Sequence, residues 1–303
     1  MDKSINLNNF SPVSVVEWKE HISRGLKDGQ NINDFKYLIG DCIEMDPFVG
    51  FDTHKSYVPL DTRIPKSCIR IPLSSNTNKI ALQVLNFGIE SILINIDQTV
   101  DFESLFNGID LSAISLYLMV EDSMVKDDLN RYLSDRYVGI SIDVHYIPSS
   151  SNTQIITLDW CDRWKEMKHT LTSFNVESND HYIITTCKDE FLVQVAELRA
   201  VRKVWQNNAN NTQCTLHQMV FIPLESVEDI HPLIPINYRI MSAYLGGADV
   251  IFFDYVEDIE LIRLTANIHH ILREESRFTI VKDPMVGSYV IEDICLKIES
   301  TLI

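Results

Sequence analysis

The sequence predicts an α/β protein, a (β/α)8 TIM barrel with an extended arm at its N-terminus, on two observations. Short apolar runs of strand length, rich in Ile, Val, Leu, Tyr and Thr, follow one another from residue 68 onward. Longer segments between them carry apolar residues at helical spacings of three and four. Strands that alternate with helices form a parallel sheet, and eight such units close into a barrel.

The expected strands can be placed in chain order. They cover residues 68–74, 90–97, 113–120, 138–147, 154–160, 181–187, 215–222 and 248–255. The helical pattern is clear over residues 188–206, where Phe191, Val195 and Leu198 are followed by Arg202 and Trp205 at the same spacing. A doubly wound open sheet is the competing interpretation, but no phosphate-binding fingerprint follows the first run.

Residues 1–67 do not follow this alternation, and they form a separate N-terminal region ahead of a barrel over residues 68–303. They hold one predicted helix within residues 13–26 and a long irregular stretch over residues 46–67. A structureless stretch of this length is unusual inside a compact domain. We therefore expect the arm to pack on something, and a partner subunit is a good candidate.

Composition argues against several classes of protein. The 303 residues carry a net charge of -17, which disfavours nucleic acid or an anionic membrane as the main partner. Neither a signal peptide nor a run of 18 apolar residues is found, so no membrane span is expected. The six cysteines are scattered without zinc-type spacing, which predicts reduced thiols in a cytoplasmic protein.

Candidate chemistry is expected at the carboxyl ends of the strands, where barrel enzymes keep their active sites. The sequence has no phosphate-binding loop, zinc-protease motif or nucleophile elbow. If alternate residues of each strand point inward, one interior set follows. It contains Arg70, Tyr117, Asp143, His145, Thr157, Asp159, Cys187, His217, Met219, Phe252 and Asp254.

Five members of this set form the candidate site: Asp143, His145, Asp159, His217 and Asp254. Carboxylates and imidazoles that converge suit a metal site or acid–base catalysis. The same groups suit a structural role, in which Arg70 and the histidines neutralise buried carboxylates in a plugged barrel, and we favour this interpretation.

Three further residues are of types that serve as nucleophiles or metal ligands in other proteins. Cys187 lies at a strand end without a base beside it in the sequence, which indicates a small buried thiol. His269 and His270 are adjacent on a predicted helix and do not share a face. We expect these two histidines to face solvent or a partner.

Three blocks in the C-terminal half carry a more specific signal. They read "EFLVQVAELRAVRKVW" at residues 190–205, "IMSAYLGGADVIFFDY" at 240–255 and "NIHHILREESRFTIVKDPMVGSYVIEDI" at 267–294. Together they resemble the end of the barrel domain of the methylmalonyl-CoA mutase family. The opening segments, "FSPVSVVEWKEHISRGLKDG" at 10–29 and "IEMDPFVGF" at 43–51, resemble the start of that family's small, non-catalytic subunit.

The resemblance implies adenosylcobalamin-dependent rearrangement of an acyl-CoA, but the sequence departs from the catalytic pattern. The family's D-x-H-x-x-G cobalamin motif is missing, since "DTHKSY" at 52–57 ends in Tyr57 and stands in another part of the chain. The helix expected to open with the active-site histidine reads "LDWCDRWKEMKHTL". Pro235 and Ala266 stand where the family's arginines are expected. The family's barrel is threaded by CoA and lined with Ser and Thr, whereas the interior set here is bulky.

These departures imply a small-subunit-like chain that is not itself catalytic and binds no cofactor. Its partner would be a cobalamin-bearing catalytic subunit, which holds the adenosylcobalamin in a heterodimer, with a homodimer possible for the isolated chain. Two alternatives stay open. One is an independent, shortened barrel enzyme with an acid–base or metal site at the strand carboxyl ends, and the other is a CoA-binding module without catalysis.

Overall fold

The computed structural model describes residues 13–40, 42–50, 59–60, 63–147, 159–173, 180–207, 214–225 and 231–303. The helices and strands of these residues follow the chain in a βα alternation after a short N-terminal group. In chain order they are α1 (Val15–Gly25), the 3-10 helix η2 (Ile32–Phe35), β1 (Tyr37–Ile39), β2 (Ile43–Met45), β3 (Lys66–Ile71), α2 (Thr77–Leu85), β4 (Ser91–Ile96), α3 (Phe102–Leu105), β5 (Ser115–Val120), α4 (Ser123–Arg136), β6 (Asp143–Ile147), α5 (Trp160–Ser173), β7 (Asp180–Thr186), α6 (Phe191–Asn207), β8 (Thr215–Phe221), α7 (Leu233–Gly246), β9 (Val250–Asp254), α8 (Ile259–His270), the π-helix η6 (Ile271–Glu275) and α9 (Tyr289–Leu302).

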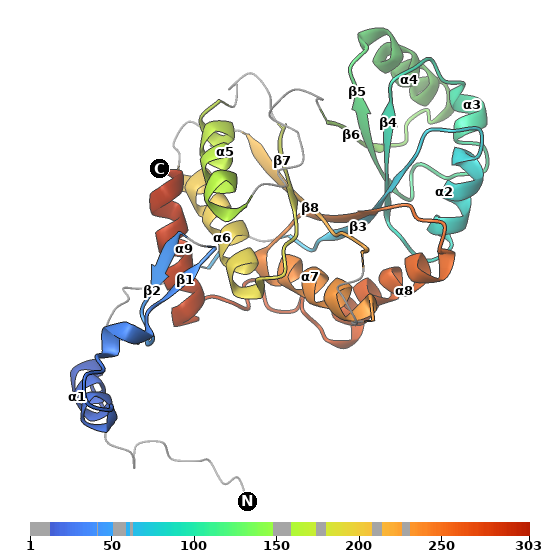
Figure 1. The fold of residues 1–303 in the computed structure, drawn as a ribbon. Coiled ribbons are helices and arrows are strands. Elements are labelled where there is room, and N and C mark those ends of the chain that lie inside the picture. Colours follow the sequence, from blue (N-terminus) through green and yellow to red (C-terminus); the bar gives the residue numbers. More distant parts are fainter. Residues whose placement is uncertain are drawn as a thin grey trace, which may run out of the picture.

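Within the described residues, seven parallel strands curl into a nearly closed barrel flanked by helices (Figure 1). The strand order is β6-β5-β4-β3-β9-β8-β7, so β6 and β7 stand at the two ends of the sheet. The predicted (β/α)8-like barrel is confirmed. The strand expected at residues 154–160 lies outside the described residues up to 158, and Trp160 opens α5.

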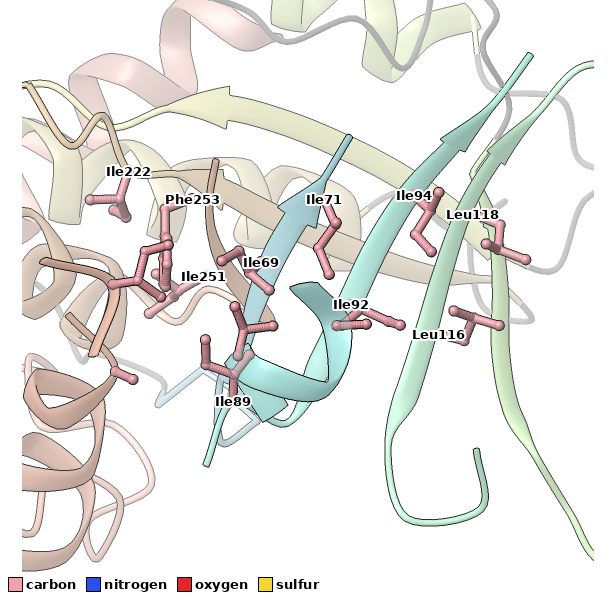
Figure 2. Packing of buried hydrophobic residues seen from close by; sticks show 14 of the residues in the cluster. Ile69, Ile71, Ile89, Ile92, Ile94, Leu116, Leu118, Ile222, Ile251 and Phe253 are labelled. Atoms are coloured by element: carbon pink, nitrogen blue, oxygen red, sulfur yellow. The ribbon is translucent and has the colours of Figure 1, made fainter. Parts of the chain in front are cut away.

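The strands alternate between an outer and an inner face, and both faces are largely buried in every described strand of the sheet except the edge strand β6. Ile69 pairs in register with Ile92, and Ile92 with Leu116. Figure 2 shows these residues in the outer layer, where they belong to the largest apolar cluster. Burial on both faces explains why the strands read as continuous apolar runs in the sequence.

Helix α6 is buried along most of its length. It packs against α7 on one side and α9 on another, and α5 also packs on α9. Residues Val193 to Arg202 of this helix, charged members included, are all buried. A helix buried on several faces must pair its charges internally, and the consequences of this are described below.

The N-terminal arm packs partly on its own barrel. Helix α1 confirms the predicted helix and begins with a capping box, in which Ser14 and Glu17 satisfy each other's backbone amides. Strands β1 and β2 form an antiparallel hairpin that packs against α9, where Lys297 Nζ donates to the carbonyl of Glu44 at 2.8 Å. Helix α1 itself has no buried residue and lies away from the barrel (Figure 1).

The prediction of reduced thiols is wrong for two of the six cysteines. Cys42 follows β1 and Cys161 lies in the first turn of α5, and they form a disulfide with their Cα atoms 6.0 Å apart. The segments that bring them together are far apart in the chain, so cysteine spacing carried no sign of the pair. In the part of the chain that the structure describes, no helix has the length and apolar character needed to cross a bilayer.

Candidate functional site

The barrel axis is filled by side chains. The inward residues form one apolar cluster, with Met119 and Phe221 packed against it: Cys68, Leu93, Tyr117, Ile147, Tyr182, Ile184, Met219, Val250 and Phe252. Tyr117 is only 2% exposed and Phe252 1%. The predicted inward orientation of Tyr117, Met219 and Phe252 is confirmed, and their bulk leaves the axis as a packed core.

The five candidate site residues do not converge at the carboxyl ends of the strands. Asp143 and His145 are the first and third residues of β6, and His217 is the third residue of β8. These three therefore lie toward the amino-terminal end of the barrel. Asp254 ends β9 at the opposite rim, and Asp159 directly precedes α5.

At the amino-terminal end, Asp143 is held by two donors from neighbouring strands. Its Oδ2 accepts hydrogen bonds from Lys66 Nζ at 2.6 Å and from Ser115 Oγ at 2.5 Å. Partial burial opposes ionisation of this carboxyl group, but the bonds from Lys66 and Ser115 outweigh it and lower its pKa to about 2. Asp143 is therefore an anion at neutral pH and a poor proton donor or acceptor.

His145 connects the two ends of the sheet. Its Nε2 lies 2.9 Å from Asp143 Oδ1, and its Nδ1 lies 3.1 Å from the hydroxyl of Tyr182 on β7. Burial lowers the pKa of the imidazole despite the neighbouring Asp143, so the ring is neutral at neutral pH. Because a carboxylate only accepts, Nε2 carries the proton and Nδ1 accepts from Tyr182. Both ring nitrogens are thus satisfied.

His217 completes this group, which we call the amino-terminal cluster (Lys66, Ser115, Tyr117, Asp143, His145, Asp180, Tyr182 and His217). Its Nε2 lies 3.0 Å from Asp180 Oδ1, and its ring stacks on Tyr182 with centroids 4.8 Å apart. The ring of His145 stacks on Tyr117 at 4.6 Å. Among the described residues, no group of three or more His, Cys, Asp or Glu side chains is placed to hold a metal ion. The cluster is arranged to bridge β6 and β7.

The carboxyl-terminal rim holds Asp254 in a different setting. Asp254 forms a bidentate ion pair with Arg70, with Nε–Oδ1 and Nη2–Oδ2 distances of 2.5 and 2.7 Å. The pair borders an open pocket of about 550 Å³ that Asn95, Asp97 and Met119 also line. Two carboxylates face one guanidinium there, so the pocket favours neutral or cationic ligands over phosphates.

Asp159 and the remaining predicted residues contribute no further site. The carboxylate of Asp159 is fully exposed and lies 3.3 Å from Lys188 Nζ. Thr157 lies outside the described residues. Cys187 is a buried thiol, as predicted, and burial raises its pKa to about 12. It belongs to the outer cluster and contacts Ser242 at 3.4 Å, so its expected inward orientation is wrong.

The expectation of a position facing solvent or a partner is also wrong for His269. His269 is 3% exposed and packs beside Tyr244, and burial lowers its pKa to about 3. His270 is half-buried, with Nε2 at 3.1 Å from the carbonyl oxygen of Phe87. The face of α8 that carries His269 turns toward the core, which the adjacent positions of the two histidines did not reveal.

The most extensive polar network lies on the outer wall around α6 and was not predicted. Arg199 of α6 pairs with Asp283 and with Glu292 of α9, and all three side chains are at most 2% exposed. Lys203 Nζ reaches the second oxygen of Glu292 at 2.7 Å. Asp283 also accepts a hydrogen bond from the backbone amide of Leu60 in the arm, at 2.9 Å. Asp283 therefore fixes the chain that leads into α9.

Helix α6 also forms hydrogen bonds with the connection between α7 and β9. Arg202 Nη2 donates to Asp249 Oδ2 and to the carbonyl oxygen of Gly247, both at 2.8 Å. Gly246 ends α7 so close to α6 that a Cβ there would lie 2.7 Å from a methyl carbon of Leu198. Gly246 and the ion pairs of Arg199, Arg202 and Lys203 described above all come from the three sequence blocks at 190–205, 240–255 and 267–294.

Helix α5 docks on α6 through a further buried ion pair. Arg163 Nη2 lies 2.6 Å from Glu197 Oε1, with both side chains fully buried, and Trp164 Nε1 donates to Glu197 Oε2 at 3.0 Å. The segment "DWCDRWKEMKH" thus contributes packing and charge pairing to the wall. Pro235 and Ala266 are likewise buried within α7 and α8.

The part of the chain that matches known proteins is the part that forms most of this network. Residues 182–303, from β7 to the end of α9, match the family model described as methylmalonyl-CoA mutase. This part of the chain is distantly related to the methylmalonyl-CoA mutase family. A curated methylmalonyl-CoA mutase from Cereibacter sphaeroides is 27% identical over 34% of this chain. The match spans 17% of that relative's length, so the mutase segment of this chain corresponds to a small part of the whole enzyme.

Two solved structures of another protein align with this chain at low similarity. Dihydropteroate synthase from Thermus thermophilus in complex with 6HMPPP aligns with 72% of this chain and 100% of its own, at 9% identity and a TM-score of 0.32. A second structure of that synthase (FolP) covers 71% of this chain and 99% of its own, at 9% identity and a TM-score of 0.30. The mutase family, in contrast, is matched through sequence.

Proposed function

We propose that this chain is a non-catalytic, small-subunit-like component of an adenosylcobalamin-dependent methylmalonyl-CoA mutase, which pairs with a catalytic chain and stabilises it. The observation that carries the proposal is the filled barrel axis. Tyr117, Tyr182 and Phe252 occupy the space through which the family's catalytic barrel threads CoA. Opening that space would uncover a packed core, at a cost of several kcal/mol for each large side chain displaced.

The acid–base groups support the same proposal. His145 has a partner on each ring nitrogen, and Asp143 is neutralised by Lys66. Burial lowers the pKa of His145 and hydrogen bonds lower that of Asp143, and both ring nitrogens of His145 already have partners, so neither group is prepared to take a proton from a substrate. The filled axis does not fit an acyl-CoA threaded through it.

The arm provides the surface for pairing in this proposal. Helix α1 is capped at its N-terminus but buries none of its residues, and Val13 and Val16 are largely exposed. Trp18 stacks on Phe48 with ring centroids 4.1 Å apart, which orders the arm around the helix. A stable heterodimer buries on the order of 2,000 Å² or more, so the outer barrel helices would have to contribute as well.

The test is co-expression with the cobalamin-domain mutase chain of the same genome. We expect the two chains to co-purify in a 1:1 complex, and the catalytic chain to melt at a higher temperature inside it than alone. A variant that lacks residues 1–26 is expected to weaken the complex and to leave the barrel folded. Separate elution of the two full-length chains would refute the proposal.

A second candidate, CoA binding without catalysis, is favoured only by the open pocket beside Arg70 and Asp254. Its excess of carboxylates opposes the phosphates of CoA. Titration calorimetry with CoA distinguishes the two candidates. We expect no heat of binding, and saturable heat that is lost in Arg70→Ala would favour the second candidate.

A further inference from the structure

The turn of the β1–β2 hairpin is fitted onto the first turn of α5. Gly40 has a positive φ of 54°, and a Cβ at this position would lie 2.5 Å from Trp160 Cβ. Only glycine allows this approach. Two residues later, Cys42 meets Cys161, which follows Trp160 in α5. Backbone packing, independent of the cysteines, therefore brings the two sulfur atoms together.

Apart from this link, the hairpin is held by few groups. Each strand has three residues, and an isolated two-stranded hairpin of this size is marginally stable in water. Ile39, Ile43 and Met45 pack into the cluster formed by α5, α6 and α9, and Lys297 binds the carbonyl of Glu44. Side-chain packing therefore holds the hairpin on the barrel, and a covalent bond at the turn adds a further constraint on its opening.

We propose that Cys42 and Cys161 form a reversible thiol–disulfide couple, which locks the β1–β2 hairpin onto α5 when oxidised and lets it open when reduced. Cys42 is exposed and Cys161 is half-buried, so small thiols and disulfides reach the pair from the Cys42 side. Cys68, Cys187 and Cys295 are buried, which keeps them out of this exchange. The proposal does not depend on the proposed function.

The oxidant is a low-molecular-weight disulfide such as glutathione disulfide. The thiolate of Cys42 attacks one of its sulfur atoms, forming a mixed disulfide and expelling one glutathione thiolate. The thiolate of Cys161 then attacks the Cys42 sulfur and expels the second. Two protein thiols lose two electrons, and the glutathione disulfide takes up these electrons and two protons to give two glutathione thiols.

The first test is redox titration of the full chain in glutathione buffers of increasing oxidised fraction, followed by alkylation and peptide mapping without reductant. We expect a cross-linked peptide that contains Cys42 and Cys161 at high oxidised fraction and both alkylated cysteines at low fraction. Recovery of both cysteines as separately alkylated peptides at every ratio would overturn the proposal.

The second test is amide hydrogen exchange of residues 37–45 in the two redox states. We expect exchange on the order of tenfold faster after reduction, because local opening of the hairpin becomes less costly. Cys42→Ser and Cys161→Ser should exchange at the fast rate in both buffers, and the half-buried Cys214→Ser should keep the wild-type difference. Equal exchange in oxidised and reduced wild type would also overturn the proposal.

Discussion

Two groups of polar side chains in this molecule are built from similar residues in different surroundings. Around α6, Arg199, Asp283 and Glu292 are at most 2% exposed, and they form ion pairs and hydrogen bonds with one another, Lys203 and the backbone. At the amino-terminal end of the barrel, Lys66 and Asp143 make an equally short contact, but their side chains are 43% and 44% exposed. Burial differs between the groups, and hydrogen-bond geometry does not.

This difference in burial indicates different structural roles for the two groups of side chains. A buried charge without its partner costs several kcal/mol, so the α6 network requires three distant segments to meet in one arrangement. This arrangement is formed within residues 182–303, the part of the chain related to the mutase family. The exposed Lys66–Asp143 pair of the amino-terminal cluster is screened by water and loses little when one partner changes. This pair therefore does not dictate the fold.

The largest effect is expected from Arg199→Met. The methionine fills a similar volume but leaves Asp283 and Glu292 as buried carboxylates with less compensation, so we expect a loss of about 3–5 kcal/mol in the free energy of unfolding. Urea denaturation followed by circular dichroism measures it. The matched control is Arg263→Met, whose pair with Glu260 on α8 is exposed and should change stability by less than about 0.5 kcal/mol. Equal losses in the two variants would remove the distinction between buried and exposed pairs.

The same difference explains how much of the molecule could be predicted from sequence. Strand runs such as residues 90–97 and 248–255 are buried on both faces, so composition identifies them without knowledge of their neighbours. The period of two predicts alternation along each strand, and the inward position of Tyr117 and Phe252 is one of the two phases that it allows. The α6 network could not be predicted in this way, because Arg199 and Asp283 are brought together only by the tertiary fold.

The expected convergence of the five candidate residues is not found, for a related reason. Asp143, His145 and Asp254 were correctly assigned to strands and to the inner face, but phase does not say at which end of a strand a residue lies. The start of β6 at Asp143 and the end of β9 at Asp254 place them at opposite rims. The position of each residue within its strand is the signal that could have separated them.

His269 sharpens the comparison, because it is buried like Arg199 but forms no ion pair within the residues that the structure describes. Burial, together with His270 and Arg273, lowers its pKa to about 3. The unfolded chain binds a proton near pH 6.5 and the folded chain does not, so stability falls as pH drops from about 6.5 toward 3. Between pH 7.5 and 5 we expect this residue to account for about 2 kcal/mol of lost stability.

Urea denaturation of His269→Leu at both pH values tests this expectation. The variant should lose less stability than the wild type over that interval, even if it is less stable at pH 7.5. His270→Leu is the control for removing a half-buried ring from the same helix, and it should follow the wild-type pH dependence. An unchanged pH dependence in His269→Leu would show that the buried imidazole is not the group that titrates.

The smallest effect is expected from Asp143→Asn in the amino-terminal cluster. The amide keeps the shape of the carboxylate and removes a charge that water already screens, so we expect a loss of under about 1 kcal/mol in the free energy of unfolding at pH 7.

The pKa of Asp143 is lowered to about 2 in the folded protein, against about 3.9 in an unfolded chain. The full shift would correspond to about 2.6 kcal/mol, but the side chain is 44% exposed and screened by water, which reduces the expected stabilisation to under about 1 kcal/mol. This stabilisation is present above about pH 4 and is lost as the pH falls toward 2. Unfolding curves of wild type and variant should differ at pH 7 and converge near pH 2. A loss at pH 7 as large as that of Arg199→Met would mean that the bridge between β6 and β7 is a determinant of the fold in its own right.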